Sequence, residues 1–206
     1  MNFVERTLVL IKPDAVKRGL IGNIVSRFEN AGLTIIAAKL VHPSIEFARK
    51  HYPTTDVQLE QMGNKTLGTY NQLGIDPIKD LGTSSAREIG LMIHEWNAEF
   101  LASGPVFACV IQGVHAVKKV RAICGKTIPI DAQPGTIRGD FSSSSPAVAN
   151  VQKSAVFNLI HASDNENDPE EPSKEIAYWF KPEEIFEHTL TDASAMFHVV
   201  PTSTGS

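Results

Sequence analysis

The order of apolar segments along the chain predicts an α+β protein. Four short apolar runs are rich in β-branched residues, and the segments between them repeat apolar residues at helical spacing. Strands and helices alternate, and two helical segments are regular enough to be the principal packing helices. This order is typical of a ferredoxin-like fold, a four-stranded antiparallel sheet with helices packed on it.

The individual elements follow from this periodicity and from the residues that end them. Strands are expected at 7–11, 33–41, 106–111 and 155–160. Helices are expected at 21–31, 44–52, 85–103, 114–123, 170–180 and 182–186. Gly32 is the expected stop of the first helix, and Ser85 with Glu88 three residues later has the pattern of a capping box.

Two stretches are less regular. Residues 54–84 contain several glycines among short apolar pieces, so we expect short helices there at most. Such a segment has too few apolar residues for a core of its own, and we expect a partly mobile cover or an assembly surface. The stretch 125–148 is expected to be a long loop, and 189–206 a poorly ordered tail.

Composition excludes several classes of function. The formal charge of −4 over 206 residues gives no general affinity for nucleic acid or anionic membranes. No apolar run approaches transmembrane length, and the N-terminus does not have the pattern of a secretory signal. Cys109 and Cys124 fall in buried segments and indicate reduced thiols, so we expect a cytoplasmic protein.

His161 follows the last apolar strand and is the strongest candidate for a reactive group. A side chain at the end of a buried strand is held rigidly, and a neutral imidazole can act as a nucleophile. A histidine that only caps the strand end is the alternative. A catalytic triad with Ser163 and Asp164 is disfavoured by their closeness in sequence, and a metal site with Asp164 has no convincing further ligands.

A set of hydrogen-bond donors suited to a phosphate chain accompanies this histidine. Its members are Lys12, Tyr52, Arg121, Thr127, Arg138 and Asn158. Each arginine taken alone is better explained by a surface ion pair. Together the donors indicate a site where His161 attacks a terminal phosphorus while cations stabilise the developing charge. Gly125-Lys126-Thr127 is not a P-loop, because Val120 stands where that motif needs glycine.

Four segments make the sequence similar to the nucleoside diphosphate kinase family. They are ERT at 5–7 with IKPDAV at 11–16 and RGL at 18–20, SGPV at 103–106, PGTIRGDF at 134–141, and NLIHASD at 158–164. The last two are highly specific, and their order and separation also match. The resemblance covers about residues 4–188 with interruptions, which implies a single domain over 1–188 and a tail over 189–206.

The resemblance implies a ping-pong phosphotransferase that forms a phosphohistidine at His161 from ATP and passes the phosphate to a nucleoside diphosphate. It implies that Lys12 and Tyr52 contact the γ-phosphate, and that Glu175, bonded by Ser163, orients the imidazole. The residues that it implies for phosphate or sugar contacts are Arg121, Thr127, Arg138 and Asn158. It also implies Mg²⁺ carried by the nucleotide phosphates, and a homo-oligomer, either a tetramer or a hexamer.

The chain departs from the family pattern at two larger insertions. We call residues 54–88 the first insertion and residues 142–157 the second insertion; a small third one precedes Glu175. The position of the family's base-stacking phenylalanine falls near Ile93, so the nucleobase platform differs. A nucleotide-binding regulatory module with little turnover is the alternative function, but such a module has no need for a nucleophile among phosphate donors.

Overall fold

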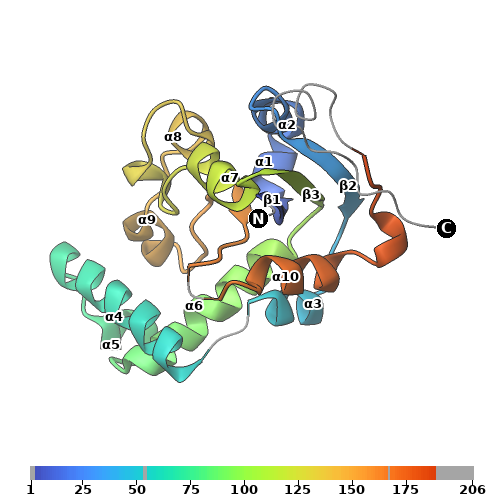
Figure 1. The fold of residues 1–206 in the computed structure, drawn as a ribbon. Helices are drawn as coiled ribbons and strands as arrows, with labels where there is room; N and C mark the ends of the chain where they lie inside the picture. Colours follow the sequence, from blue (N-terminus) through green and yellow to red (C-terminus); the bar gives the residue numbers. More distant parts are fainter. Residues whose placement is uncertain (1–2, 53–54, 167, 189–206) are drawn as a thin grey trace.

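The computed structural model describes residues 3–52, 55–166 and 168–188. Its sheet consists of β1 (Val4–Ile11), β2 (Thr34–Val41), β3 (Val106–Val114) and β4 (Ile160–Ala162). The strands lie in the order β2-β3-β1-β4, and every neighbouring pair is antiparallel. This arrangement, shown in Figure 1, confirms the predicted ferredoxin-like α+β fold.

The helices agree with most of the predicted ranges. They are α1 (Pro13–Lys17), α2 (Ile21–Glu29), α3 (Ile45–His51), α4 (Asp56–Leu73), α5 (Pro77–Leu81), α6 (Ala86–Leu101), α7 (Ala116–Cys124), α8 (Ile137–Phe141), α9 (Pro146–Val151) and α10 (Glu171–Trp179), with 3₁₀ turns at Pro129–Asp131 and Pro182–Glu184. None of the described helices is both long enough and apolar enough to cross a bilayer. The expected tail, 189–206, lies outside the described residues.

Helices cover both faces of the sheet (Figure 1). Side chains of a strand alternate between its two faces, and β1 is apolar on both. Val9 and Ile11 pack into a core shared with α2 and α7, whereas Leu8 and Leu10 pack into a core shared with α3, α6 and α10. Because β1 is buried on both sides, its C-terminal end holds the next residue, Lys12, in a fixed place.

Several predicted boundaries were wrong. Val114 belongs to β3, because the strand continues to pair with β1 up to Val4, and the helix begins after it. The expected loop at 125–148 contains α8 and the start of α9. Of the helix expected at 182–186, only a 3₁₀ turn at Pro182–Glu184 forms. Ser85 caps α6, but the Glu88 carboxylate binds the hydroxyl of Thr83, so the reciprocal half of the capping box is replaced.

The expectation of only short helices at 54–84 was also wrong. The 18-residue helix α4 runs through this segment, starts with a capping box at Thr55 and Gln58, and packs along α6. A Cβ on Gly63 would lie 1.8 Å from the carbonyl oxygen of Ala86, and one on Gly90 would lie 2.1 Å from that of Leu59. These two glycines therefore allow the two helix backbones to touch.

The two larger insertions are joined to each other. Helix α9 of the second insertion packs against α4 of the first. The hydroxyl of the fully buried Tyr70 lies 2.7 Å from Asp80 Oδ2 and 3.3 Å from the carbonyl oxygen of Asn150. Lys153 Nζ donates to the carbonyl oxygen of Asp80 at 2.8 Å and lies 3.3 Å from its Oδ1. A polar junction thus links segments about 80 residues apart in the sequence.

Candidate active site

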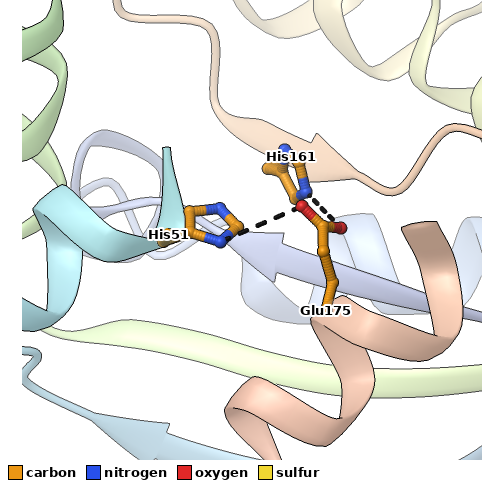
Figure 2. Close-up of side chains that lie close together, drawn as sticks. All are labelled: His51, His161 and Glu175. Carbon is orange, nitrogen blue, oxygen red and sulfur yellow. Dashed lines mark hydrogen bonds and ion pairs between the residues drawn. The ribbon is translucent and has the colours of Figure 1, made fainter. Parts of the chain in front are cut away.

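His161 lies in the middle of β4, opposite Leu10 of β1, and not after the strand as expected. Its Nε2 is 2.9 Å from Oε2 of Glu175, which projects from α10 (Figure 2). The hydroxyl of Ser163 donates to the same Glu175 oxygen and accepts the backbone N–H of Leu8 at 3.3 Å. The structure therefore brings His161, Ser163 and Glu175 together. With the proton on Nε2, the second ring nitrogen, Nδ1, keeps its lone pair free.

Glu175 is suited to orient a neutral imidazole. Burial opposes the ionisation of its carboxyl group, but the neighbouring His161 and the bonds from His161 and Ser163 outweigh burial, so the pKa of Glu175 lies below its ordinary value. The ionised carboxylate accepts the Nε2–H of His161 and can stabilise positive charge on the ring. The side chain of His161 is 21% exposed, so the ring stays accessible to a ligand.

The strand expected at 155–160 was wrong except at Ile160, because a tight turn precedes β4 and residues 155–159 form no strand. Leu159 has a φ of 67°, in the left-handed region that non-glycine residues rarely adopt. Its N–H donates to Asp14 Oδ2 at 3.0 Å, and its carbonyl accepts the N–H of Lys12 at 2.8 Å. These contacts hold the turn between Asn158 and His161, two of the predicted site residues. Asp14, which the sequence analysis left without a role, is a part of this support.

Lys12 extends from the end of β1 and is buried, with 6% of its surface exposed. Its Nζ donates to Asn158 Oδ1 at 2.9 Å and lies 5.9 Å from the ring centre of Tyr52. Burial and the nearby Arg138 lower the pKa of Lys12 to about 8. Asn158 also donates from Nδ2 to the carbonyl oxygen of Thr127 at 3.2 Å, so its amide joins Lys12 to the loop that carries Thr127.

Arg138 is buried beneath the same loop. Its guanidinium donates to three backbone carbonyls: Asn158 at 3.1 Å, Gly125 at 2.7 Å and Ile160 at 2.6 Å. Guanidinium has five N–H groups, so donors remain for another acceptor. The contacts to Asn158 and Ile160 also bind the loop to the residues on either side of the strained turn.

Arg121 lies on α7, where Nη2 pairs with Asp164 at 2.7 Å. Together with Arg138 and Thr127 it lines a pocket of about 240 Å³. The complete lining is Arg121, Cys124, Gly125, Lys126, Thr127, Arg138 and Ala162. Three of the residues predicted to hold phosphate thus meet at one cavity. Arg121 and Arg138 also lie 3.5 Å and 2.6 Å from the carbonyl oxygens of Ala162 and Ile160, the residues on either side of His161. A larger hollow of about 510 Å³ lies between Arg18 and the second insertion.

Two other residues named in the sequence analysis lie on α6 and next to α3. Tyr52 directly follows α3, and its buried hydroxyl has no hydrogen-bond partner among the described residues. Ile93 lies on α6 and is partly exposed. The sequence analysis missed His51, which precedes Tyr52 and whose ring packs against that of His161 with centroids 4.7 Å apart. Its place beside a predicted site residue was the one available signal.

His51, His161 and Glu175 form a group whose possible ligand atoms lie within 4.8 Å of one another (Figure 2). Their present contacts oppose metal binding. Nδ1 of His51 accepts the indole N–H of Trp179 at 3.2 Å, and Nε2 of His161 is bound to Glu175. A metal bound at these two nitrogens would have to displace both hydrogen bonds.

The fold and this site define an enzyme that transfers phosphoryl groups: a carboxylate-oriented histidine lies beside a cation-lined pocket on an antiparallel sheet. The sequence pattern of the family described as nucleoside diphosphate kinase matches residues 5–60 and 86–185. The chain belongs to this family, as the sequence analysis predicted. The unmatched stretch, 61–85, contains most of α4 and all of α5.

Individual relatives support membership of this family. The nucleoside diphosphate kinase of Pyrobaculum aerophilum is 46% identical over 89% of this chain and 99% of its own length. The crystal structure of the NDP kinase from that organism superimposes with a TM-score of 0.84 at 45% identity, covering 89% of this chain and 100% of the other. A transition-state mimic of the enzyme from Borrelia burgdorferi, with bound vanadate and ADP, gives a TM-score of 0.72 at 35% identity. The match covers 94% of this chain and 96% of the other.

Proposed function

We propose that the protein transfers the γ-phosphate of a nucleoside triphosphate, typically ATP, to a nucleoside diphosphate through a phosphohistidine at His161. One observation carries this proposal. Glu175 holds Nε2 of His161 at 2.9 Å, so that the free Nδ1 is the nucleophile beside a pocket lined by Arg121 and Arg138. A relative that binds vanadate and ADP as a transition-state mimic supports the same chemistry.

Bonds, electrons and charges balance in the proposed step. The lone pair of Nδ1 forms an N–P bond while the bond between the γ-phosphorus and its bridging oxygen breaks, and the diphosphate leaves with that electron pair. The ring becomes positively charged, and Glu175 stabilises this charge from the other nitrogen. In the second half of the cycle a different diphosphate attacks the phosphorus and regenerates neutral His161.

The remaining residues have two kinds of proposed role. Lys12, Tyr52, Arg121, Thr127 and Arg138 bind phosphate oxygens and spread the charge of the transition state. Asn158 positions Lys12 and the loop, since its side chain is engaged on both sides, at 2.9 Å and 3.2 Å; a sugar contact would need one of these bonds to yield. Ser163 holds Glu175 in place.

We expect Mg²⁺ to be the divalent metal and to arrive with the nucleotide, where it neutralises phosphate charge. Mg²⁺ prefers oxygen ligands in octahedral geometry. In the part of the chain that the structure describes, the one group of three potential ligands offers two imidazoles and a carboxylate. That donor set suits Mg²⁺ poorly and supports a metal held by the phosphates.

The wider setting is also a proposal. We propose a single domain over 1–188 that assembles as a homo-oligomer, a tetramer or hexamer, in the cytoplasm. Free, buried Cys109 and Cys124 suit a reducing compartment. We propose that the first insertion covers the ligand or meets a neighbouring subunit. Replacing 54–84 with a short Gly/Ser connector would raise KM in the first case and lower the assembly mass in the second.

Incubation with γ-labelled ATP tests the proposed function. We expect acid-labile label on the protein, and its release when a nucleoside diphosphate is added. His161→Ala should abolish labelling while ADP binding persists, because the phosphate donors remain. Label that persists in this variant would remove His161 from the role of nucleophile. Absence of label in the unaltered protein, with ADP still bound, would instead favour the regulatory module.

A further inference from the structure

A second histidine contacts the proposed nucleophile. His51 is the last residue of α3 and is 4% exposed. Its ring meets that of His161 at an interplanar angle of 84°, with centroids 4.7 Å apart. It also packs edge to face against Trp179, at 5.5 Å between centroids. The ring is therefore held between α10 and the reacting imidazole, with little freedom to turn.

Trp179 fixes the tautomer of His51. The indole Nε1 can only donate a hydrogen bond, and it lies 3.2 Å from Nδ1 of His51. Nδ1 must therefore carry the lone pair, and in the neutral ring the proton resides on Nε2. The carboxylate oxygen Oε1 of Glu175, 3.9 Å from Nδ1, lies beyond hydrogen-bond distance.

The Nε2–H that results is a buried donor without a partner among the described residues. A buried polar group in this condition costs free energy unless a ligand satisfies it. In Figure 2 the ring nitrogens of His51 and His161 that carry no dashed line both point to the upper side of the view, away from Glu175. The unused donor thus lies on the same side as the nitrogen that attacks phosphorus.

His51 stays neutral at working pH. Burial, together with the nearby His161 and Lys12, lowers the pKa of His51 to about 3, and Glu175 opposes this only in part. A neutral imidazole can donate a hydrogen bond without adding a charge that would compete for Glu175. Glu175 therefore remains available to stabilise positive charge on His161.

We propose that His51 is a catalytic residue that donates its Nε2–H to an oxygen of the phosphoryl group while that group is transferred to and from His161. The inference rests on the proposed phosphohistidine. His51 gives up no proton in the step: the N–P bond forms, the bond to the bridging oxygen breaks, and the hydrogen bond strengthens as charge develops on the phosphoryl oxygens. A donor placed in this way lowers the barrier for both half-reactions.

Two substitutions test the roles of the two ring nitrogens of His51 separately. His51→Gln places an amide N–H near the position of Nε2 and removes the acceptor for Trp179. His51→Asn places an oxygen near Nδ1, which keeps the acceptor, and removes the Nε2 donor. Rapid-quench labelling of His161 by ATP gives the rate of the chemical step, ADP titration gives Kd, and thermal melts give Tm. His42→Gln, an exposed histidine bonded to a backbone carbonyl, is the control.

We expect His51→Asn to slow labelling by roughly 100-fold, the usual effect of losing one donor to a transition state, while Kd for ADP stays within about threefold. His51→Gln should retain labelling within about tenfold, and His42→Gln within about twofold. If the His51→Asn variant does not fold, His51→Phe replaces it, because phenylalanine keeps a ring without the donor. His161 should then be labelled as slowly as expected for His51→Asn.

Three results would overturn the proposal. If His161 is labelled faster in His51→Asn than in His51→Gln, the hydrogen bond to Trp179 matters more than the Nε2 donor. If His161 is labelled at a near-normal rate in His51→Phe, the role of His51 is packing alone. Equal rates in all variants would remove His51 from the reaction. Labelling of the unaltered protein is measured in the same series, so a failure of the phosphohistidine itself would be recognised separately.

Discussion

The surroundings of His161 and the two larger insertions are stabilised in different ways. Around His161, polar side chains from the residues after β1, the turn before β4 and α10 bind one another or the backbone of a distant segment, as Lys12 does with Asn158. Between α4 and α6 the backbones themselves touch, at Gly63 and Gly90. The first region depends on which atoms donate and accept, and the second depends on the absence of side-chain atoms.

This difference indicates how each region should respond to substitution. Removal of a polar group near His161 should alter the rate of reaction more than stability or binding. Addition of a methyl group between α4 and α6 should alter stability more than reaction rate. The polar junction of Tyr70, Asp80 and Lys153 is the part of the insertions that most resembles the site.

The largest effect is expected for Glu175→Ala. Without its carboxylate the imidazole of His161 loses its orientation and the stabilisation of its positive charge, so kcat should fall by about 10²–10³-fold. Kd for ADP should stay within about threefold, because the phosphate donors are unchanged. Glu171→Ala, one turn earlier in α10, is the matched control. Equal losses in kcat and in ADP affinity would point to a structural role for Glu175.

A smaller effect is expected for Gly63→Ala in α4. The new methyl group would overlap the carbonyl of Ala86 and push the helices apart, which should lower the free energy of unfolding by about 1–3 kcal/mol. Gly68→Ala in the same helix meets nothing within 4 Å and should raise it by about 0.5–1 kcal/mol. Chemical denaturation measures both. If Gly63→Ala reduced His161 labelling at unchanged stability, the contrast between the two regions would fail.

The third prediction concerns pH. Because the pKa of Lys12 is lowered to about 8, the free enzyme loses this positive charge as pH rises from 7 to 9, and kcat/KM should fall about tenfold. Lys12→Arg should show no such alkaline decrease, whatever its overall activity. Kinetics from pH 6 to 10 test this. A flat profile in the unaltered enzyme, or an alkaline decrease that persists in the arginine variant, would contradict it.

The same shift has a consequence for stability. The folded protein releases the Lys12 proton at a lower pH than the unfolded chain does, so the unfolded state binds more protons between about pH 8 and 10.5. In that window the contribution of Lys12 makes the free energy of unfolding rise with pH. Denaturation midpoints of the unaltered protein and of Lys12→Gln, compared across the window, isolate this contribution.

Much of the site could be predicted from local sequence. Strand ends place the residues that follow them at the edge of a sheet, as Lys12 follows β1, whereas His161 lies within the short β4. The resemblance to a known family added Glu175, Ser163 and Tyr52. Asp14 and His51 could not be predicted in the same way, because their roles depend on contacts with Leu159 and His161, which are more than 100 residues away in sequence.

The sequence by itself indicated the four-stranded sheet through apolar periodicity, and the family and the proposed nucleophile through motifs, because periodicity and motifs are local properties. Only the tertiary structure decided the long helix in the first insertion, the strained turn at Leu159 and the tautomer of His51. Glycines in 54–84 indicated breaks as long as each was considered alone. Gly63 becomes a helix contact because the backbone of Ala86 lies opposite it, and packing between distant segments outweighs the intrinsic preference of a single residue.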